Sequence, residues 1–83
     1  MDDPAQAAEA DLEAGRALYH AGRLDDAERW ATQALARHPD SYGLWNLKGA
    51  VLRQLKRPTE AVAALERAVG LDPREYGARM NLG

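Results

Sequence analysis

The segment YGLWNLKGAVLRQLKRPTEAVAALERAVGLDP, residues 42–73, decides the fold of this 83-residue chain. Its apolar residues recur at intervals of about 3.6, and no stretch alternates apolar with polar residues, so the segment predicts helices without strands. A turn at residues 56–59 separates a helix over about 42–55 from a second helix over about 59–71. Pro58 suits the opening turn of that second helix.

The same pattern occurs 34 residues earlier, so the chain repeats itself. Gly15 is in register with Gly49, and Gly83 belongs to a third copy that has only begun. A fixed period of this size indicates a repeat array, in which each unit is one helical module stacked on its neighbours. Other residues in register are Leu18 with Leu52, Ala27 with Ala61, Ala34 with Ala68, Pro39 with Pro73, and Tyr42 with Tyr76.

The first copy predicts two further helices. The first of them covers about residues 5–20 and ends at the break formed by residues 21–23. Asp25, followed three residues later by Glu28, resembles a capping box, so Asp25 is expected to open the next helix. Residues 75–83 predict the start of a fifth helix. The connections are short, so consecutive helices are expected to pack antiparallel.

Two mid-helix glycines indicate a close approach between helices. Gly15 and Gly49 occupy one phase of the period, where glycine costs about 1 kcal/mol relative to alanine. A sequence that keeps glycine there needs the space of the missing side chain, and Ala27 and Ala61 are the expected opposing surfaces. The large residues Leu18, Trp30, Trp45, Leu52 and Leu65 are expected to fill the core on either side, and the apolar stripe of the fourth helix is expected to include Val62.

Composition and charge narrow the class of protein. The chain has no cysteine and two histidines, which leaves no thiol nucleophile and too few ligands for a zinc site. No apolar run approaches the roughly 20 residues that cross a membrane, and the acidic N-terminus is not a signal peptide, so a cytoplasmic location is predicted.

The net charge of −2 is unevenly distributed. Residues 1–41 carry nine acids and four arginines (−5), whereas residues 42–83 carry four acids and seven bases (+3). This asymmetry could favour head-to-tail association or an extended charged ligand, or it could reflect only solvated helix faces.

No catalytic or nucleic-acid motif is present. His38, Asp40 and Ser41 supply the residue types of a hydrolytic triad but share one short linker, and a triad requires groups that converge from separate elements. The small basic cluster within residues 53–57 lacks the broad positive field and stacking aromatics of a nucleic-acid site. The sequence therefore predicts no catalytic residue, no metal, no cofactor and no nucleic-acid or membrane partner.

The second copy resembles the tetratricopeptide repeat (TPR) through Trp45-x2-Lys48-Gly49-x2-Leu52, Ala61-x3-Leu65 and Asp72-Pro73. The usual pattern is W-x2-L-G-x2-Y, A-x3-F and P. The first copy departs from it at Asp11 and Ala14, where Trp and Leu are usual, and a polar Asp11 fits a terminal, water-facing repeat.

The resemblance implies an all-α fold of antiparallel helix-turn-helix repeats stacked as a right-handed α-solenoid. Its expected parts are a lead-in at residues 1–7, repeats at residues 8–41 and 42–75, and the truncated start of a third repeat at residues 76–83.

The same resemblance implies a non-catalytic scaffold that binds a protein or peptide in the groove lined by the first helix of each repeat. Arg16 and Arg53 could hold carboxylates there, while Tyr19 and Asn46 could bond a peptide backbone. The residues expected on this face are Glu9, Leu12, Glu13, Arg16, Tyr19, His20, Gly43, Asn46, Leu47, Ala50, Arg53, Gln54, Gly77, Met80 and Asn81.

Two other functions stay open at this point. The chain could oligomerise through an exposed C-terminal end around Met80 and Leu82. It could also be the accessory N-terminal TPR segment of a larger enzyme such as a glycosyltransferase. Two repeats and a fraction favour a fragment of a longer array, because fewer than three repeats are rarely stable alone.

Overall fold

A computed structural model describes residues 4–71, with side chains from residue 7 onward. Within that range the chain forms α-helices and no strand, as the sequence predicts. The expected fifth helix, together with Gly77, Met80, Asn81 and Leu82, lies outside the described residues. The helices are α1 (Pro4–His20), α2 (Leu24–Arg37), α3 (Tyr42–Gln54) and α4 (Pro58–Leu71).

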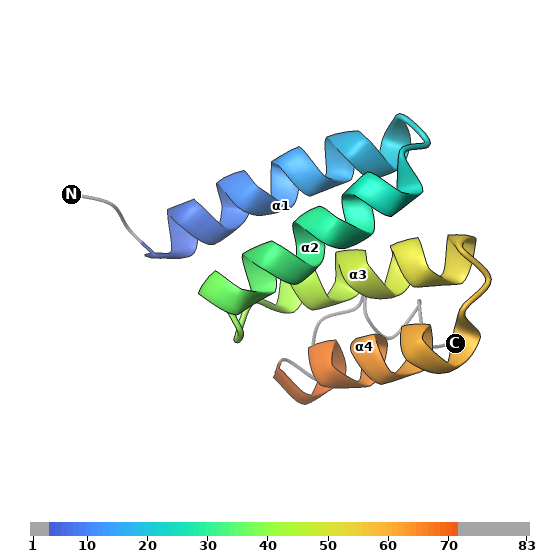
Figure 1. Cartoon of the computed structure of the whole chain (residues 1–83). Helices are drawn as coiled ribbons and strands as arrows, with labels where there is room; N and C mark the ends of the chain where they lie inside the picture. The colour runs from blue at the N-terminus through green and yellow to red at the C-terminus, as the bar shows by residue number, and fades with distance from the viewer. Residues whose placement is uncertain (1–3, 72–83) are drawn as a thin grey trace.

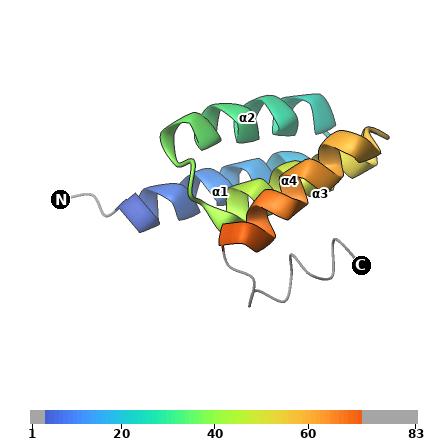
Figure 2. The same ribbon diagram turned by 90° about the horizontal axis from the view of Figure 1, so that it is seen from below.

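Consecutive helices run in opposite directions and follow one another across the molecule in chain order (Figure 1). α1 contacts both α2 and α3, and α3 contacts both α2 and α4. In the view turned by 90°, α2 stands to one side of α1 and α3, so the helices do not lie in one plane (Figure 2). Two helical hairpins are therefore stacked so that their first helices, α1 and α3, are neighbours.

Each hairpin closes with the same backbone turn. At the end of α1, the N–H of Gly22 donates to the carbonyl of Tyr19 and that of Arg23 donates to Leu18, both at 3.0 Å. This pair of bonds is the Schellman arrangement, which places one residue in the left-handed conformation. Gly22 takes it with φ 80°, and Lys56 takes the matching position in the second hairpin with φ 62°.

The expected capping box at Asp25 is wrong. α2 begins at Leu24, its N-cap is Arg23, and no side chain caps it. The reason is the Schellman turn, because Arg23 completes that turn and directly precedes α2, which leaves Asp25 inside the first helical turn. α3 is capped in the usual way, since its N-cap Ser41 accepts a hydrogen bond from the Leu44 N–H at 3.3 Å.

The two mid-helix glycines lie at close contacts. A Cβ atom on Gly49 would be 2.6 Å from Cδ2 of Leu65 and 3.3 Å from the carbonyl oxygen of Ala61. A Cβ atom on Gly15 would be 2.5 Å from Cδ2 of Leu47 and 2.9 Å from Cδ1 of Trp30. Both positions are too tight for a side chain. The expected alanine opposite the glycine is therefore found at Gly49, whereas large side chains cover Gly15.

The buried apolar residues of the described chain are alanine, leucine and valine. Leu44 and Ala64 are buried although they are not among the residues expected in the core, and Val62, which is expected there, is 48% exposed. Val62 directly follows the buried Ala61 and is turned away from α3 by the 100° step between helical neighbours. The other buried apolar residues are Ala27, Ala31, Ala34, Leu35, Leu47, Val51, Leu52, Leu65 and Ala68.

The two hairpins fill equivalent space with different side chains. Trp45 on α3 packs against the cluster that contains Ala64 of α4. In the first hairpin the matching residues are Asp11 and Trp30, so the indole comes from the second helix instead of the first. The Trp30 Nε1 donates to the Asp11 carbonyl at 2.6 Å. Asp11 is not water-facing, as its side chain is only 20% exposed.

Replacing Gly49 tests the close contact. Gly49→Leu should lower the free energy of unfolding by about 3 kcal/mol, because the new side chain must displace Leu65 from a packed core. The matched control is Gly70→Ala on α4, where nothing lies within 4 Å of the added methyl group. Helix propensity alone should make that variant more stable by about 0.5 kcal/mol. Urea denaturation measures both, and equal destabilisation of the two would refute the contact.

Lys56 offers a gain in stability. A non-glycine residue in the left-handed conformation is strained by about 1 kcal/mol, so Lys56→Gly should raise the free energy of unfolding by about that amount. Gly22→Ala should lower it by a similar amount at the equivalent turn, although a Cβ atom on Gly22 would meet no other atom within 4 Å. Thermal unfolding of the two variants gives shifts of opposite sign if the turn geometry is responsible.

Candidate functional site

The first helices of the two hairpins carry the residues predicted to form a binding face. These helices, α1 and α3, are in contact with each other. Glu9, Glu13, Arg16 and His20 on α1 and Arg53 and Gln54 on α3 are exposed, while Leu12, Tyr19, Gly43, Asn46 and Ala50 are half-buried.

Leu47 does not belong to this face. It is 6% exposed and packs in one cluster with Ala27, Ala31 and Val51. Its side chain reaches the space that Gly15 leaves open in the preceding hairpin. The prediction for Leu47 is therefore wrong, because a contact with the neighbouring hairpin, and not the phase of its own helix, determines where it lies.

Two of the predicted residues join the face to the core. Leu12 packs against two core clusters, and Tyr19 packs against the cluster that contains Leu47. The Tyr19 ring lies edge-on to the ring of His20, with centroids 5.4 Å apart. Tyr19 is consequently held in place at its base while part of its ring stays accessible.

An open hollow of about 620 Å³ lies at one end of this face. It lies where the start of α1 meets the turn between α2 and α3. Both of these segments are at the left of Figure 1. Three segments line it: Ala8, Glu9 and Leu12 of α1, residues 37–41 at the end of α2 and in the turn, and Tyr42 and Gly43 of α3. Of the predicted residues that the structure describes, the hollow brings together Glu9, Leu12 and Gly43, and the others are not part of its lining.

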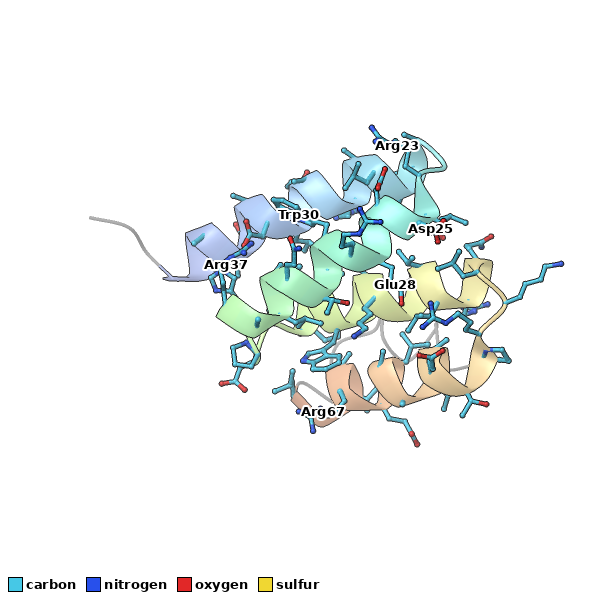
Figure 3. The ribbon with its side chains drawn as sticks, viewed as in Figure 1. Arg23, Asp25, Glu28, Trp30, Arg37 and Arg67 are labelled. Carbon is cyan, nitrogen blue, oxygen red and sulfur yellow. The ribbon has the colours of Figure 1, made fainter. Side chains whose placement is uncertain are left out.

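Asp11 contacts two residues that line the hollow, Arg37 and His38. Its Oδ2 accepts a hydrogen bond from Nη2 of Arg37 at 2.9 Å and lies 3.2 Å from Nε2 of His38. The Arg37 guanidinium is also 5.9 Å from the centroid of the Trp30 ring. Figure 3 shows Trp30 and Arg37 together on the side of α2 that adjoins α1. The end of α2 is thereby fixed to α1 by charge as well as by packing.

The rim of the hollow carries two carboxylates of a different kind. Glu9 and Asp40 are both exposed and line the hollow. Within residues 7–71, neither makes a hydrogen bond or an ion pair. Among the charged groups that line the hollow, these two acids are therefore the ones left without a counter-charge.

Arg57 joins the two hairpins on the other side of the molecule. Its Nη1 is 2.7 Å from Oε2 of Glu28 on α2, and its Nε is 2.6 Å from Oε2 of Glu60 on α4. Figure 3 shows Glu28 on the side of α2 that faces α4. The hydrogen bond to Glu60 raises the pKa of the Arg57 guanidinium above its ordinary value, and the hydrogen bond to Glu28 adds a smaller effect in the same direction. The Arg57 hydrogen bond lowers the pKa of Glu60 from its ordinary value of 4.5.

Trp45 stabilises the turn that borders the hollow. Its Nε1 donates to the carbonyl of Pro39 at 2.8 Å. The Arg67 guanidinium and the Lys48 ammonium lie 5.2 Å and 5.7 Å from the centroid of its ring. Such cation–π contacts are worth about 0.5–1 kcal/mol each at exposed sites. Trp45 thus fixes the position of the residues after α2.

The described part of the chain holds no group of three or more histidine, cysteine, aspartate or glutamate side chains arranged to bind a metal. None of its helices combines the length and the apolar character needed to cross a bilayer.

The sequence did not indicate the hollow. The sequence predicts a helix end and a turn at residues 38–41 and no binding role for them, yet residues 37–41 supply half of the lining of the hollow. One signal was available: in a stack of antiparallel hairpins, the end of each second helix must lie beside the starts of the first helices. Arg37, His38 and Asp40 therefore had to be neighbours of residues 8–12.

The ion pair of Glu60 makes stability depend on pH. Because the folded-state pKa of Glu60 is depressed, the ionised carboxylate stabilises the fold above pH 4.5, and this contribution is lost as the pH falls through the folded-state pKa. Glu60→Gln should therefore be less stable than the parent at pH 7 and equal to it at low pH. Urea denaturation across this range tests it.

Two further variants identify the cause. In an Arg57→Gln background the difference at pH 7 should shrink, because the partner is gone. Glu66→Gln, at an exposed position of α4 without a described partner, should show no such difference. A pH-independent effect of Glu60→Gln would show that the carboxylate charge contributes nothing.

Comparison with known proteins agrees with the helical stack. No curated protein matches the chain. The family model described as tetratricopeptide repeat matches residues 2–41 and again residues 12–78, which together span most of the chain. With two stacked antiparallel hairpins at a 34-residue period, the chain belongs to the tetratricopeptide repeat family.

Proposed function

We propose that this chain is a non-catalytic scaffold that binds a protein or peptide along the neighbouring faces of α1 and α3. TPR domains are generally protein-interaction scaffolds. One observation carries the proposal here: α1 and α3 are in contact, and the two helices together expose the polar side chains of Glu9, Glu13, Arg16, His20, Arg53 and Gln54 beside the half-buried Tyr19.

The chemistry of this face suits an extended peptide. Arg16 and Arg53 are exposed donors that would bind carboxylates or backbone carbonyls. The Glu13–Arg16 pair is long, at 3.7 Å, and both side chains are more than half exposed, so a ligand would break it at little cost. Tyr19 adds a partly buried ring, which presents contact area with little loss of conformational entropy.

A catalytic role for the turn residues is disfavoured by their partners. Nε2 of His38 lies beside the Asp11 carboxylate, and Oγ of Ser41 is occupied as the cap of α3. Neither side chain points to the other as a base and nucleophile would. These residues serve the ends of helices.

Head-to-tail self-association is the weaker alternative. The outward stripe of α1 consists of the exposed Ala10, Ala14 and Ala17. The matching positions of α3 are Leu44, Lys48 and Val51, of which Leu44 and Val51 pack against α2. An alanine stripe would bury much less apolar area in such a stack, so it supports a solvated face. The other proposed end, at Met80 and Leu82, lies outside the described residues.

Selection of peptides followed by NMR titration tests the function. Peptides of about ten residues selected from a random library should shift the amide signals of Arg16, Arg53 and Gln54. Arg16→Ala and Arg53→Ala should each weaken binding about fivefold and leave thermal unfolding unchanged, since both side chains are exposed.

The matched control for this titration is Arg29→Ala. Arg29 is also exposed but lies on α2, with a 3.5 Å pair to Asp26. Binding should be unaffected by this change. Signals that shift on α2 and α4 instead of α1 and α3 would show that the scaffold uses its other side.

A further inference from the structure

We propose that the hollow at the start of α1 is an anchor pocket for a large aliphatic side chain of a peptide that carries lysine or arginine beside it. This inference rests on the proposed peptide-binding function and names the ligand class. It depends on three features of the hollow, namely its fixed floor, its size, and the sign of the unpaired charge on its rim.

The floor is apolar and rigid. Leu12 lines the hollow and packs against two core clusters, one of which includes Leu44 of α3. Gly43 lies directly beneath it, because a Cβ atom on Gly43 would be 2.6 Å from Cδ2 of Leu12. Ala8 and Pro39 complete the apolar lining. A floor whose side chain is already held by the core costs little entropy when a ligand binds.

The size fits a side chain together with a short stretch of backbone. The hollow of about 620 Å³ falls within the range of small-ligand pockets, about 300–1,000 Å³. It is open to solvent and continuous with α1, since Glu9 and Leu12 belong both to the hollow and to the proposed peptide face. A peptide lying along α1 could therefore place one side chain in it.

The rim selects for positive charge. The Arg37 guanidinium is already committed to the Asp11 carboxylate and to the Trp30 ring. Glu9 and Asp40 keep their charge unpaired among the described residues. An acidic ligand would have to break the Arg37–Asp11 pair and would face both carboxylates, whereas a basic ligand meets them directly.

Matched peptides provide the probe. One nine-residue peptide has a central leucine with lysines on both sides in a glycine–serine background. A second replaces the lysines by glutamate, and a third replaces the leucine by serine. In NMR titrations the lysine–leucine peptide should bind about tenfold more tightly than either of the others and should shift the amide signals of Ala8 and Gly43.

Charge reversal on the rim isolates the pocket. Glu9→Lys and Asp40→Lys should each weaken the lysine–leucine peptide about fivefold, and the double variant by more, without changing thermal unfolding, because both acids are exposed and unpaired. Glu66→Lys on α4 makes the same change in net charge far from the hollow, and it should leave binding unchanged. If Glu66→Lys weakens binding as much as Glu9→Lys and Asp40→Lys do, the effect of charge is non-specific and the proposal is overturned.

The remaining outcomes separate the pocket from the scaffold function. If library-selected peptides shift Arg16 and Arg53 but the lysine–leucine peptide does not bind, the scaffold function stands and the pocket assignment falls. Tighter binding of the glutamate peptide, or retained affinity in Glu9→Lys with Asp40→Lys, also overturns the assignment. If no selected peptide contacts α1 or α3, the proposed function fails and the pocket with it.

Discussion

The close approach of helices at Gly15 and Gly49 is the constraint on which the rest of the structure depends. Leu65 fills the space over Gly49 from within the same hairpin, whereas Leu47 fills the space over Gly15 from the next one. The absence of a side chain at Gly49 thus allows α3 and α4 to pack closely within the second hairpin, and its absence at Gly15 allows the two hairpins to pack against each other. Because Leu47 of α3 packs over Gly15 of α1, these two helices are in contact. The sides of α1 and α3 that are not buried in this contact lie next to each other.

The exchange of indoles between the hairpins connects this packing to the hollow. In the second hairpin Trp45 occupies the first helix, and Ala64 leaves room for it. In the first hairpin Trp30 comes from the second helix, so position 11 is free to hold a carboxylate. That carboxylate pairs with Arg37, so the positive charge of Arg37 at the hollow has a counter-charge. The position of the indole in the first hairpin therefore also determines which charged groups lie next to the hollow.

The sequence predicts helix positions well and side-chain partners less well. Periodicity and proline placed all four helices within a few residues, because these signals act within one segment. The cap of α2 was mispredicted because the turn before it already uses Arg23, and Leu47 because its partner lies 32 residues away at Gly15. The hollow combines three segments that no local pattern connects. Each failure concerns a contact between elements.

The apolar floor and the acidic rim of the hollow would select different parts of a bound peptide. Leu12 packs against the core and lies close to Gly43, so this part of the lining is apolar and suits an aliphatic group. Glu9 and Asp40 stand in solvent, where each charge contributes little because water screens it. One anchor with two screened charges supports modest affinity. In the proposed complex, tighter binding would come from the long contact along α1 and α3, and the hollow would fix the register of the peptide on that face.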